Sequence, residues 1–213
     1  MKKVLFAAIA VFGLAFNAGA QSKGDVEFGA NIGANYAYIG GKDGTSDARF
    51  NWNAGIAADY YFSDRWSVKA KLIYDRKGWN DGYLLFGNDA FDPVHATVIY
   101  NTHFNLDYLT IPVTANWHFG KKRNWYLHFG PYVGFLVNAK DTRFKNDVKD
   151  FFKTTDFGAN VGIGVKIPVT DKLKIFVEYD EQAGLTEIYK TNKFSKVTNS
   201  RGALNVGINV ILK

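Results

Sequence analysis

The chain has 213 residues, of which 47% are hydrophobic and 16% aromatic, and its formal net charge is +6. This length allows one domain with a sizeable core, and the aromatic content excludes a disordered chain. The absence of cysteine excludes disulfide bonds, zinc–thiolate sites and thiol nucleophiles. A positive charge would suit a nucleic-acid partner, but the first residues predict export, so no nucleic-acid partner is expected.

The first twenty residues have the three parts of a secretory signal peptide. Two lysines are followed by the apolar run Val4–Phe16, and small residues precede Gln21. The apolar run is too short to cross a bilayer as a helix, which needs about 20 such residues. We therefore expect residues 1–20 to be cleaved and residues 21–213 to form a single domain. No later apolar run is long enough either, so a membrane location would require a closed β-barrel.

Along the rest of the chain hydrophobicity alternates with a period of two residues, which predicts β-strands rather than helices. The pattern is clearest over 26–38 and 50–62. In the seventh segment it fades after Asp180, which indicates a bulge. The eight predicted strands are 26–38, 50–62, 66–75, 109–119, 125–138, 156–167, 174–180 and 203–212.

The connections between these strands alternate in length. Short turns are predicted at 63–65, 120–124 and 168–172, and long connections at 40–49, 80–102, 140–155 and 188–200. This alternation, with both chain ends on the short-turn side, is typical of bacterial outer-membrane barrels. The longest connection, 80–102, has two interpretations: a loop packed on itself, or a projecting hairpin whose edge accepts a partner strand. Its aspartates, Asp81, Asp89 and Asp92, lack the dense spacing of a Ca²⁺ site.

The apolar face of the strands is predicted to point outward. A secreted lipocalin is also an eight-stranded up-and-down barrel, but its interior is apolar. Here the apolar face carries more large side chains than so narrow an interior can hold, whereas the other face is rich in Gly, Ala and Asn. Aromatic residues also end the apolar rows, as in the girdles of membrane barrels. The predicted fold is therefore all-β: an eight-stranded antiparallel up-and-down transmembrane β-barrel.

The predicted interior carries charges of both signs. A charge inside a narrow barrel must be paired or hydrogen-bonded, which predicts a salt-bridged plug; a narrow polar conduit is the alternative. The predicted lumen network comprises Glu27, Asp59, Lys69, Lys71, Lys166, Lys174, Glu178 and Asp180, with Asp75 on the same face.

The sequence offers few candidates for catalysis. His118 and His128 are predicted on one interior face, where they fill polar positions or form a metal pair that lacks a nearby carboxylate. Ser67 has no evident His partner, so the Ser–His arrangement that activates a nucleophile is not predicted. We expect no enzyme activity, no catalytic residues, no cofactor and no metal.

The last long connection is basic. Lys190, Lys193, Lys196 and Arg201 form a predicted basic loop patch without an acid among them. Such a patch is either a solvated loop or a surface that attracts lipopolysaccharide phosphates.

Four sequence segments resemble one known family. They are NLDYLTIPV at 105–113, YLHFGPYVGFL at 126–136, FGANVGIG at 157–164, and Glu178–Tyr179 followed by GLTEI at 184–188. Together they resemble the PorT-like outer-membrane β-barrel proteins, typical of Bacteroidetes. The resemblance implies an eight-stranded outer-membrane barrel. The family's namesake serves type IX secretion, a role that does not extend to its members in general.

These observations predict a non-enzymatic protein of the Gram-negative outer membrane. Its four long loops would face the exterior, for binding or for a structural role in the envelope. The alternatives are a narrow porin-like channel and a secreted lipocalin-like carrier of apolar ligands. The expected partners are outer-membrane lipid, lipopolysaccharide and an unidentified envelope or extracellular protein, and a monomer is favoured.

Overall fold

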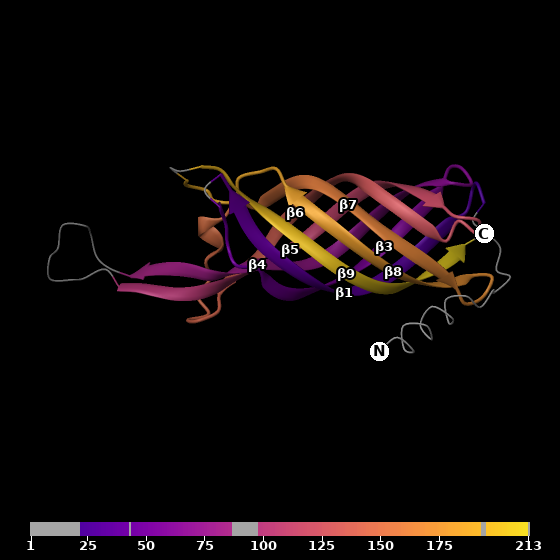
Figure 1. Cartoon of the computed structure of the whole chain (residues 1–213). Coiled ribbons are helices and arrows are strands. Elements are labelled where there is room, and N and C mark those ends of the chain that lie inside the picture. Colours follow the sequence, from indigo (N-terminus) through magenta and orange to yellow (C-terminus); the bar gives the residue numbers. More distant parts are fainter. Residues whose placement is uncertain (1–21, 43, 87–97, 193–194, 213) are drawn as a thin grey trace, which may run out of the picture.

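The computed structural model describes residues 22–42, 44–86, 98–192 and 195–212. The signal-peptide prediction for residues 1–20 therefore lies outside the described residues. No helix in these ranges is long and apolar enough to cross a membrane. The strands are β1 (Val26–Gly41), β2 (Gly44–Thr45), β3 (Arg49–Tyr61), β4 (Trp66–Phe86), β5 (Val98–Phe119), β6 (Trp125–Asp141), β7 (Thr155–Pro168), β8 (Leu173–Gly184) and β9 (Val197–Leu212), and a short 3-10 helix, η1 (Lys149–Phe151), follows β6 (Figure 1).

The eight long strands close into a ring. Each pairs antiparallel with the next long strand along the chain, and the first, β1, also pairs with the last, β9, over its full length, from Val26 opposite Leu212 to Gly41 opposite Val197. The two-residue β2 pairs only with the C-terminal residues of β1, Gly40 and Gly41. Among the described strands, closure leaves no unpaired sheet edge around the wall. The predicted eight-stranded up-and-down barrel is confirmed.

The apolar rows point away from the barrel axis. Ile32, Ile56 and Val161 are 66%, 61% and 55% exposed, whereas Glu27 and Lys166 on the other face are almost completely buried. An apolar outer wall with a polar interior suits lipid on the outside, because the closed ladder satisfies the backbone groups. It is the reverse of the arrangement in a lipocalin-like carrier.

Glycines on the inner face of β7 make room for the large rings of β6. A Cβ at Gly164 would lie 2.4 Å from Oη of Tyr126, and a Cβ at Gly162 would lie 2.3 Å from Nε2 of His128. Rings on one strand thus fill the space that the neighbouring strand leaves empty. This alternation of large and small side chains is how a narrow barrel packs its interior.

Strands β4 and β5 continue far beyond their predicted ends. The pairing register shifts between Trp79 and Gly82, where Gly78 (φ 136°) and Asp81 (φ 55°) have positive φ angles. The predicted strand ended at residue 75 because the charged Arg76 follows Tyr74 on the outward, apolar row. The bulge then interrupts the alternation of side chains further along the strand. Beyond it Gly82 pairs with Thr102, and the two strands form a hairpin that projects past the others (Figure 1). The hairpin is confirmed where residues 82–86 pair with residues 98–102, in place of a loop packed on itself. Residues 87–97 of this segment lie outside the described residues, and binding of a partner strand at the hairpin edge stays a prediction.

Two other predicted boundaries are corrected. The register between β7 and β8 is continuous up to Gly184, so the bulge expected after Asp180 is absent from this described stretch. The pattern faded there because Glu181 faces outward, where its carboxylate accepts a hydrogen bond from Tyr179 Oη at 2.6 Å. Strand β9 begins at Val197 rather than at residue 203.

The two ends of the barrel differ. Short connections at 62–65, 120–124 and 169–172 lie at one end, which we call the turn end, together with the C-terminal residues of β9. The connections 142–154 and 185–196 and the β4–β5 hairpin lie at the opposite end, which we call the loop end (Figure 1).

Candidate functional site: the closed lumen and the mouth of the barrel

Near the turn end the interior is organised around one ammonium group. Lys166 Nζ donates to Glu27 Oε2 at 2.5 Å, to Asp59 Oδ2 at 2.9 Å and to Tyr61 Oη at 2.6 Å. Lys174 Nζ donates to the other oxygen of Glu27 at 2.5 Å. These groups come from β1, β3, β7 and β8, so the contacts cross the lumen.

Midway along the barrel a single carboxylate gathers the next set of contacts. Glu178 accepts hydrogen bonds from Lys71, from Lys69 at 3.4 Å and from Tyr126 Oη at 2.7 Å. The Lys69 ammonium also lies 4.4 Å from the ring centroid of Tyr126. These side chains are all buried, and Tyr126 joins this second layer to the first, since the Lys166 ammonium lies 5.5 Å from its ring centroid.

The third layer contains Arg201, and its position corrects the predicted basic loop patch. Arg201 belongs to β9 and is fully buried, with Nε 3.1 Å from Asp75 and Nη1 2.7 Å from Asp180. Because β9 begins before residue 203, the strand alternation turns this side chain into the barrel. Arg201 is therefore an interior charge and no part of a surface patch.

Closer to the loop end, Lys77 and Asp156 form another buried pair at 3.1 Å. Tyr132 Oη donates to the same carboxylate at 3.2 Å, and the amide of Asn199 donates to it at 3.3 Å. The sequence pattern missed this pair because the predicted strand 66–75 ended before Lys77, although Asp156 lay inside the predicted strand 156–167. Continuing the alternation of Lys69 and Lys71 along β4 would have placed Lys77 inside.

The ion pairs inside the described barrel balance in charge. All eight residues of the predicted lumen network are buried, and four more join them. Six carboxylates face six cations: Glu27, Asp59, Asp75, Asp156, Glu178 and Asp180 against Lys69, Lys71, Lys77, Lys166, Lys174 and Arg201. We call these twelve residues the interior charges.

Among the described residues, the two interior histidines, His118 and His128, belong to no cluster of side chains that could bind a metal ion. The described residues contain no group of three His, Asp or Glu side chains that could hold a metal ion. Contrary to the sequence-based expectation, Ser67 does have a His partner, since its Oγ lies 3.0 Å from Nε2 of His118. Both side chains are fully buried, and Nδ1 of His118 has no hydrogen-bond partner among the described residues. His128 lies 3.7 Å from Glu178.

Above the interior charges the barrel holds an apolar core that the sequence pattern did not predict. Trp79 stacks at a tilt on Phe104, with ring centroids 4.9 Å apart, and Phe152 meets both rings edge-on at 5.9 and 6.3 Å. We call this cluster the mouth core; its members are Trp79, Phe104, Leu106, Tyr108, Leu136, Ala139, Val148, Phe152 and Ile188. Loop residues beside η1 and before β9 thus fold into the end of the barrel.

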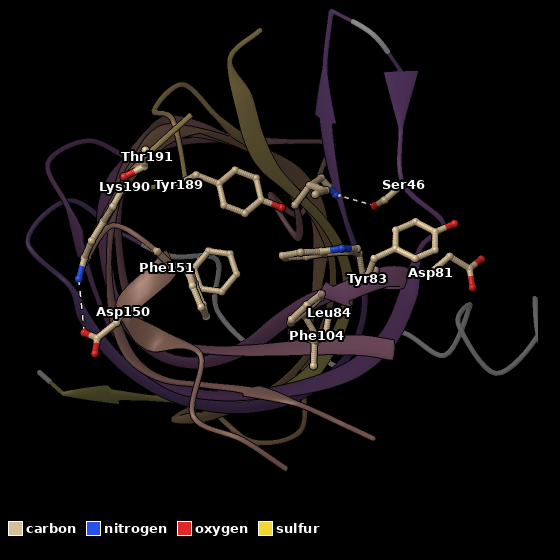
Figure 2. A pocket seen from close by; sticks show the side chains of 14 residues that line it. Ser46, Asp81, Tyr83, Leu84, Phe104, Asp150, Phe151, Tyr189, Lys190 and Thr191 are labelled. Carbon is tan, nitrogen blue, oxygen red and sulfur yellow. Dashed lines mark hydrogen bonds and ion pairs between the residues drawn. The ribbon is translucent and has the colours of Figure 1, made fainter. Parts of the chain in front are cut away.

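A pocket of about 630 Å³ opens on the mouth core. Its floor includes buried rings of the mouth core, and its rim carries Phe151, Tyr189, Lys190 and Asp150 (Figure 2). The ring of Tyr189 extends into the space enclosed by the strands, with its hydroxyl at the inner end (Figure 2). Burial and the nearby Glu187 carboxylate raise the pKa of Tyr189 to about 12, so the hydroxyl remains a donor at neutral pH. We call this space the mouth pocket.

The loop that carries Tyr189 is held by Glu187. Its carboxylate accepts hydrogen bonds from the backbone N–H of Tyr189 at 3.0 Å, from that of Val197 at 3.0 Å and from the amide of Asn192 at 2.8 Å. Burial acts to raise the pKa of Glu187, but these donors outweigh it and the pKa is lowered. The loop around the mouth pocket is therefore built on an ionised carboxylate.

Sequence comparison decides the family. Residues 19–190 match the family described as outer membrane protein beta-barrel domain. The chain belongs to this family. No curated protein matches the chain.

Solved structures of outer-membrane barrels share the fold. Neisserial surface protein A is 18% identical, with a TM-score of 0.50, over 86% of this chain and 96% of that one. The outer membrane protein OprG of Pseudomonas aeruginosa is 9% identical, with a TM-score of 0.52, over 92% and 99%. At these identities the likeness shows the fold alone. The family and the apolar outer wall place this barrel in the outer membrane, in contact with lipid.

What remains of the predicted basic loop patch is small. Lys190 and Lys196 are exposed at the loop end, and Lys190 Nζ lies 3.6 Å from Asp150. Lys193 lies outside the described residues. Asp89 and Asp92 also fall outside them, and Asp81 lies on the rim of the mouth pocket. With Arg201 inside the barrel, the loop retains less positive charge than the sequence indicated.

Proposed function

We propose that this outer-membrane barrel is a non-enzymatic, non-conducting scaffold that presents its loop end for binding at the cell surface. The observation that carries the proposal is the set of interior charges, which are paired at several levels along the lumen. An eight-stranded barrel has an interior just wide enough for side chains to fill. Paired charges in that space leave the loop end, with its mouth pocket, as the part available to a partner.

The proposed orientation places the loop end outside the cell. Outer-membrane barrels have short periplasmic turns and longer extracellular loops, and the lengths of the connections here follow that rule. The proposal includes removal of residues 1–20 as a signal peptide and a single domain over 21–213. It also includes a monomer, because the barrel wall closes on itself without a second chain.

A non-enzymatic role fits the environment of the Ser67–His118 pair. A nucleophilic Ser needs a base that a third group orients and a site that substrate can reach. Both side chains are buried, and no described residue bonds to the second nitrogen of His118. We also propose that the chain is a PorT-like member of its family, on the strength of the four sequence segments, with lipopolysaccharide as its lipid neighbour.

Planar-bilayer recording tests the closed lumen. Purified wild-type protein, with its folded state checked beforehand, should give no stepwise conductance, while a large porin in the same bilayer serves as the positive control. Reproducible single-channel steps from the wild-type protein would overturn the proposal and favour the narrow channel.

A further inference from the structure

We propose that the mouth pocket binds an uncharged, ring-shaped and largely apolar small molecule that carries a hydrogen-bond acceptor. This inference deepens the proposed function, because it names the ligand class for the loop end. It rests on that function only in placing the pocket at the cell surface.

The size and walls of the mouth pocket favour a small molecule. Its volume of about 630 Å³ falls within the range of about 300–1,000 Å³ typical of ligand sites. The rings of Trp79, Phe104 and Phe152 are held by contacts with one another and are 7% exposed or less. A floor fixed in this way is preformed, so a ligand need not pay for ordering it.

One polar group in the pocket can select a ligand. The hydroxyl of Tyr189 points inward and has no hydrogen-bond partner among the described residues, whereas the backbone N–H of the same residue is bonded to Glu187. A ligand with a carbonyl or ether oxygen could accept a hydrogen bond from this hydroxyl. A few placed polar groups in an apolar site are what usually fix ligand orientation.

The charges at the rim argue against an ionic ligand. Lys190 and Asp150 are paired with each other at 3.6 Å, and Asp81 adds a negative charge on the rim. An anion would meet two carboxylates for one ammonium group. A cation would have to leave water for an apolar floor that contains no carboxylate among the residues described, which is costly.

Ligand binding by the full barrel in lipid nanodiscs tests the inference. The probe is coumarin, an uncharged aromatic ring system with a carbonyl acceptor, and its binding is followed by saturation-transfer NMR. Naphthalene has a similar ring system without the acceptor, and benzoate adds a negative charge. We expect saturable binding of coumarin and binding of naphthalene up to about tenfold weaker, the equivalent of one hydrogen bond. Benzoate should bind more weakly still.

Two variants locate the site. Tyr189→Phe keeps the ring and removes the hydroxyl, so it should lower the affinity for coumarin up to about tenfold and leave naphthalene unchanged. Thr191→Trp places a large side chain on the pocket lining and should weaken both probes. The matched control is Leu185→Ala, an exposed residue of the same loop that does not line the pocket; this variant should bind as wild type does.

The possible results separate the two proposals. Coumarin signal equal to that of empty nanodiscs, or equal affinity in wild type and both pocket variants, would overturn the assignment of the mouth pocket. A barrel that binds coumarin as expected but conducts ions would overturn the closed scaffold alone. A closed barrel without coumarin binding would overturn the ligand class alone.

Discussion

Lys166 shows what a buried charge requires of its neighbours in this protein. Its ammonium group donates three hydrogen bonds, to Glu27, Asp59 and Tyr61, all within 2.9 Å, and its side chain is fully buried. A buried ammonium group is stable here only because other strands place its hydrogen-bond partners at the same level along the barrel axis. Substitutions in this group should therefore destabilise the protein, because the loss of one member of an ion pair leaves the other as an uncompensated buried charge.

Replacing Lys166 should therefore be costly. Lys166→Met removes the ammonium group, so Asp59 loses its ion-pair partner and Glu27 keeps only Lys174. The free energy of unfolding should fall by about 3–5 kcal/mol. Urea unfolding in lipid vesicles, followed by tryptophan fluorescence, measures the change. Adding Asp59→Asn should recover part of the loss, because it removes one stranded charge.

The matched control for this prediction is Lys172→Met, in the short turn between β7 and β8, where the side chain is exposed. It should change the stability by less than about 0.5 kcal/mol. Equal losses in the two variants would contradict the structural role given to Lys166.

At the scale of the strands, the wall depends on which face each residue occupies. Val161 on β7 is 55% exposed on the outer wall, and Val169 in the following turn is 44% exposed. The two valines are similarly accessible, but only Val161 lies within the apolar band. They form a matched pair that separates a lipid environment from an aqueous one.

Val161→Asp should lower the stability in lipid by about 1–3 kcal/mol, because a carboxylate is placed against hydrocarbon. Val169→Asp should have little effect, since the turn lies outside the band. The measurement is again unfolding in vesicles of defined lipid. Similar small losses for both would mean that the outer wall does not face lipid.

The sequence predicted the strands where alternation was strict and failed where a bulge or polar residue interrupted it. The strand from Val26 to Tyr38 could be predicted from the alternation alone, because every second side chain faces the same environment. The bulge between Trp79 and Gly82 hid the continuation of β4 into the hairpin, and the outward Glu181 hid the end of β8. Where the alternation of polar and apolar residues is interrupted, the sequence pattern wrongly predicts that the strand ends.

The candidate site was harder to predict than the wall. The predicted lumen network followed from alternation alone, and the structure places its eight residues inside. Arg201 was misplaced because the early start of β9 becomes visible only in its pairing with β1 and β8. The mouth core joins residues from β4, β5, β6 and two loops. The mouth core depends on contacts between segments that are far apart in the sequence, and these contacts cannot be predicted from the pattern of neighbouring residues.

For the whole molecule, closure between β1 and β9 has a direct consequence for its behaviour in detergent. A closed barrel resists unfolding by SDS at room temperature and is more compact than the extended chain. Unboiled protein from the outer-membrane fraction should therefore migrate faster on an SDS gel than boiled protein. Identical mobility before and after boiling would contradict a stable ring.

Ala34→Pro should abolish this shift. Ala34 lies in the middle of β1, opposite Trp52 on β3 and Leu204 on β9. Because β1 is hydrogen-bonded on both sides at this position, a proline there removes a backbone hydrogen bond between paired strands. A shift that survives the substitution would mean that the β1 pairing contributes little to the compact state.

The interior charges also bear on the order of events during assembly. Lys166 and Glu27 are 139 residues apart in the sequence, and Lys174 and Glu27 are 147 apart. The first strand to be synthesised thus carries a carboxylate whose counter-ions arrive only with the sixth and seventh long strands along the chain, β7 and β8. A partly built sheet entering lipid would expose unneutralised charge on its inner side. Insertion and closure are for this reason expected to proceed together, with water retained in the lumen until the last strand meets the first.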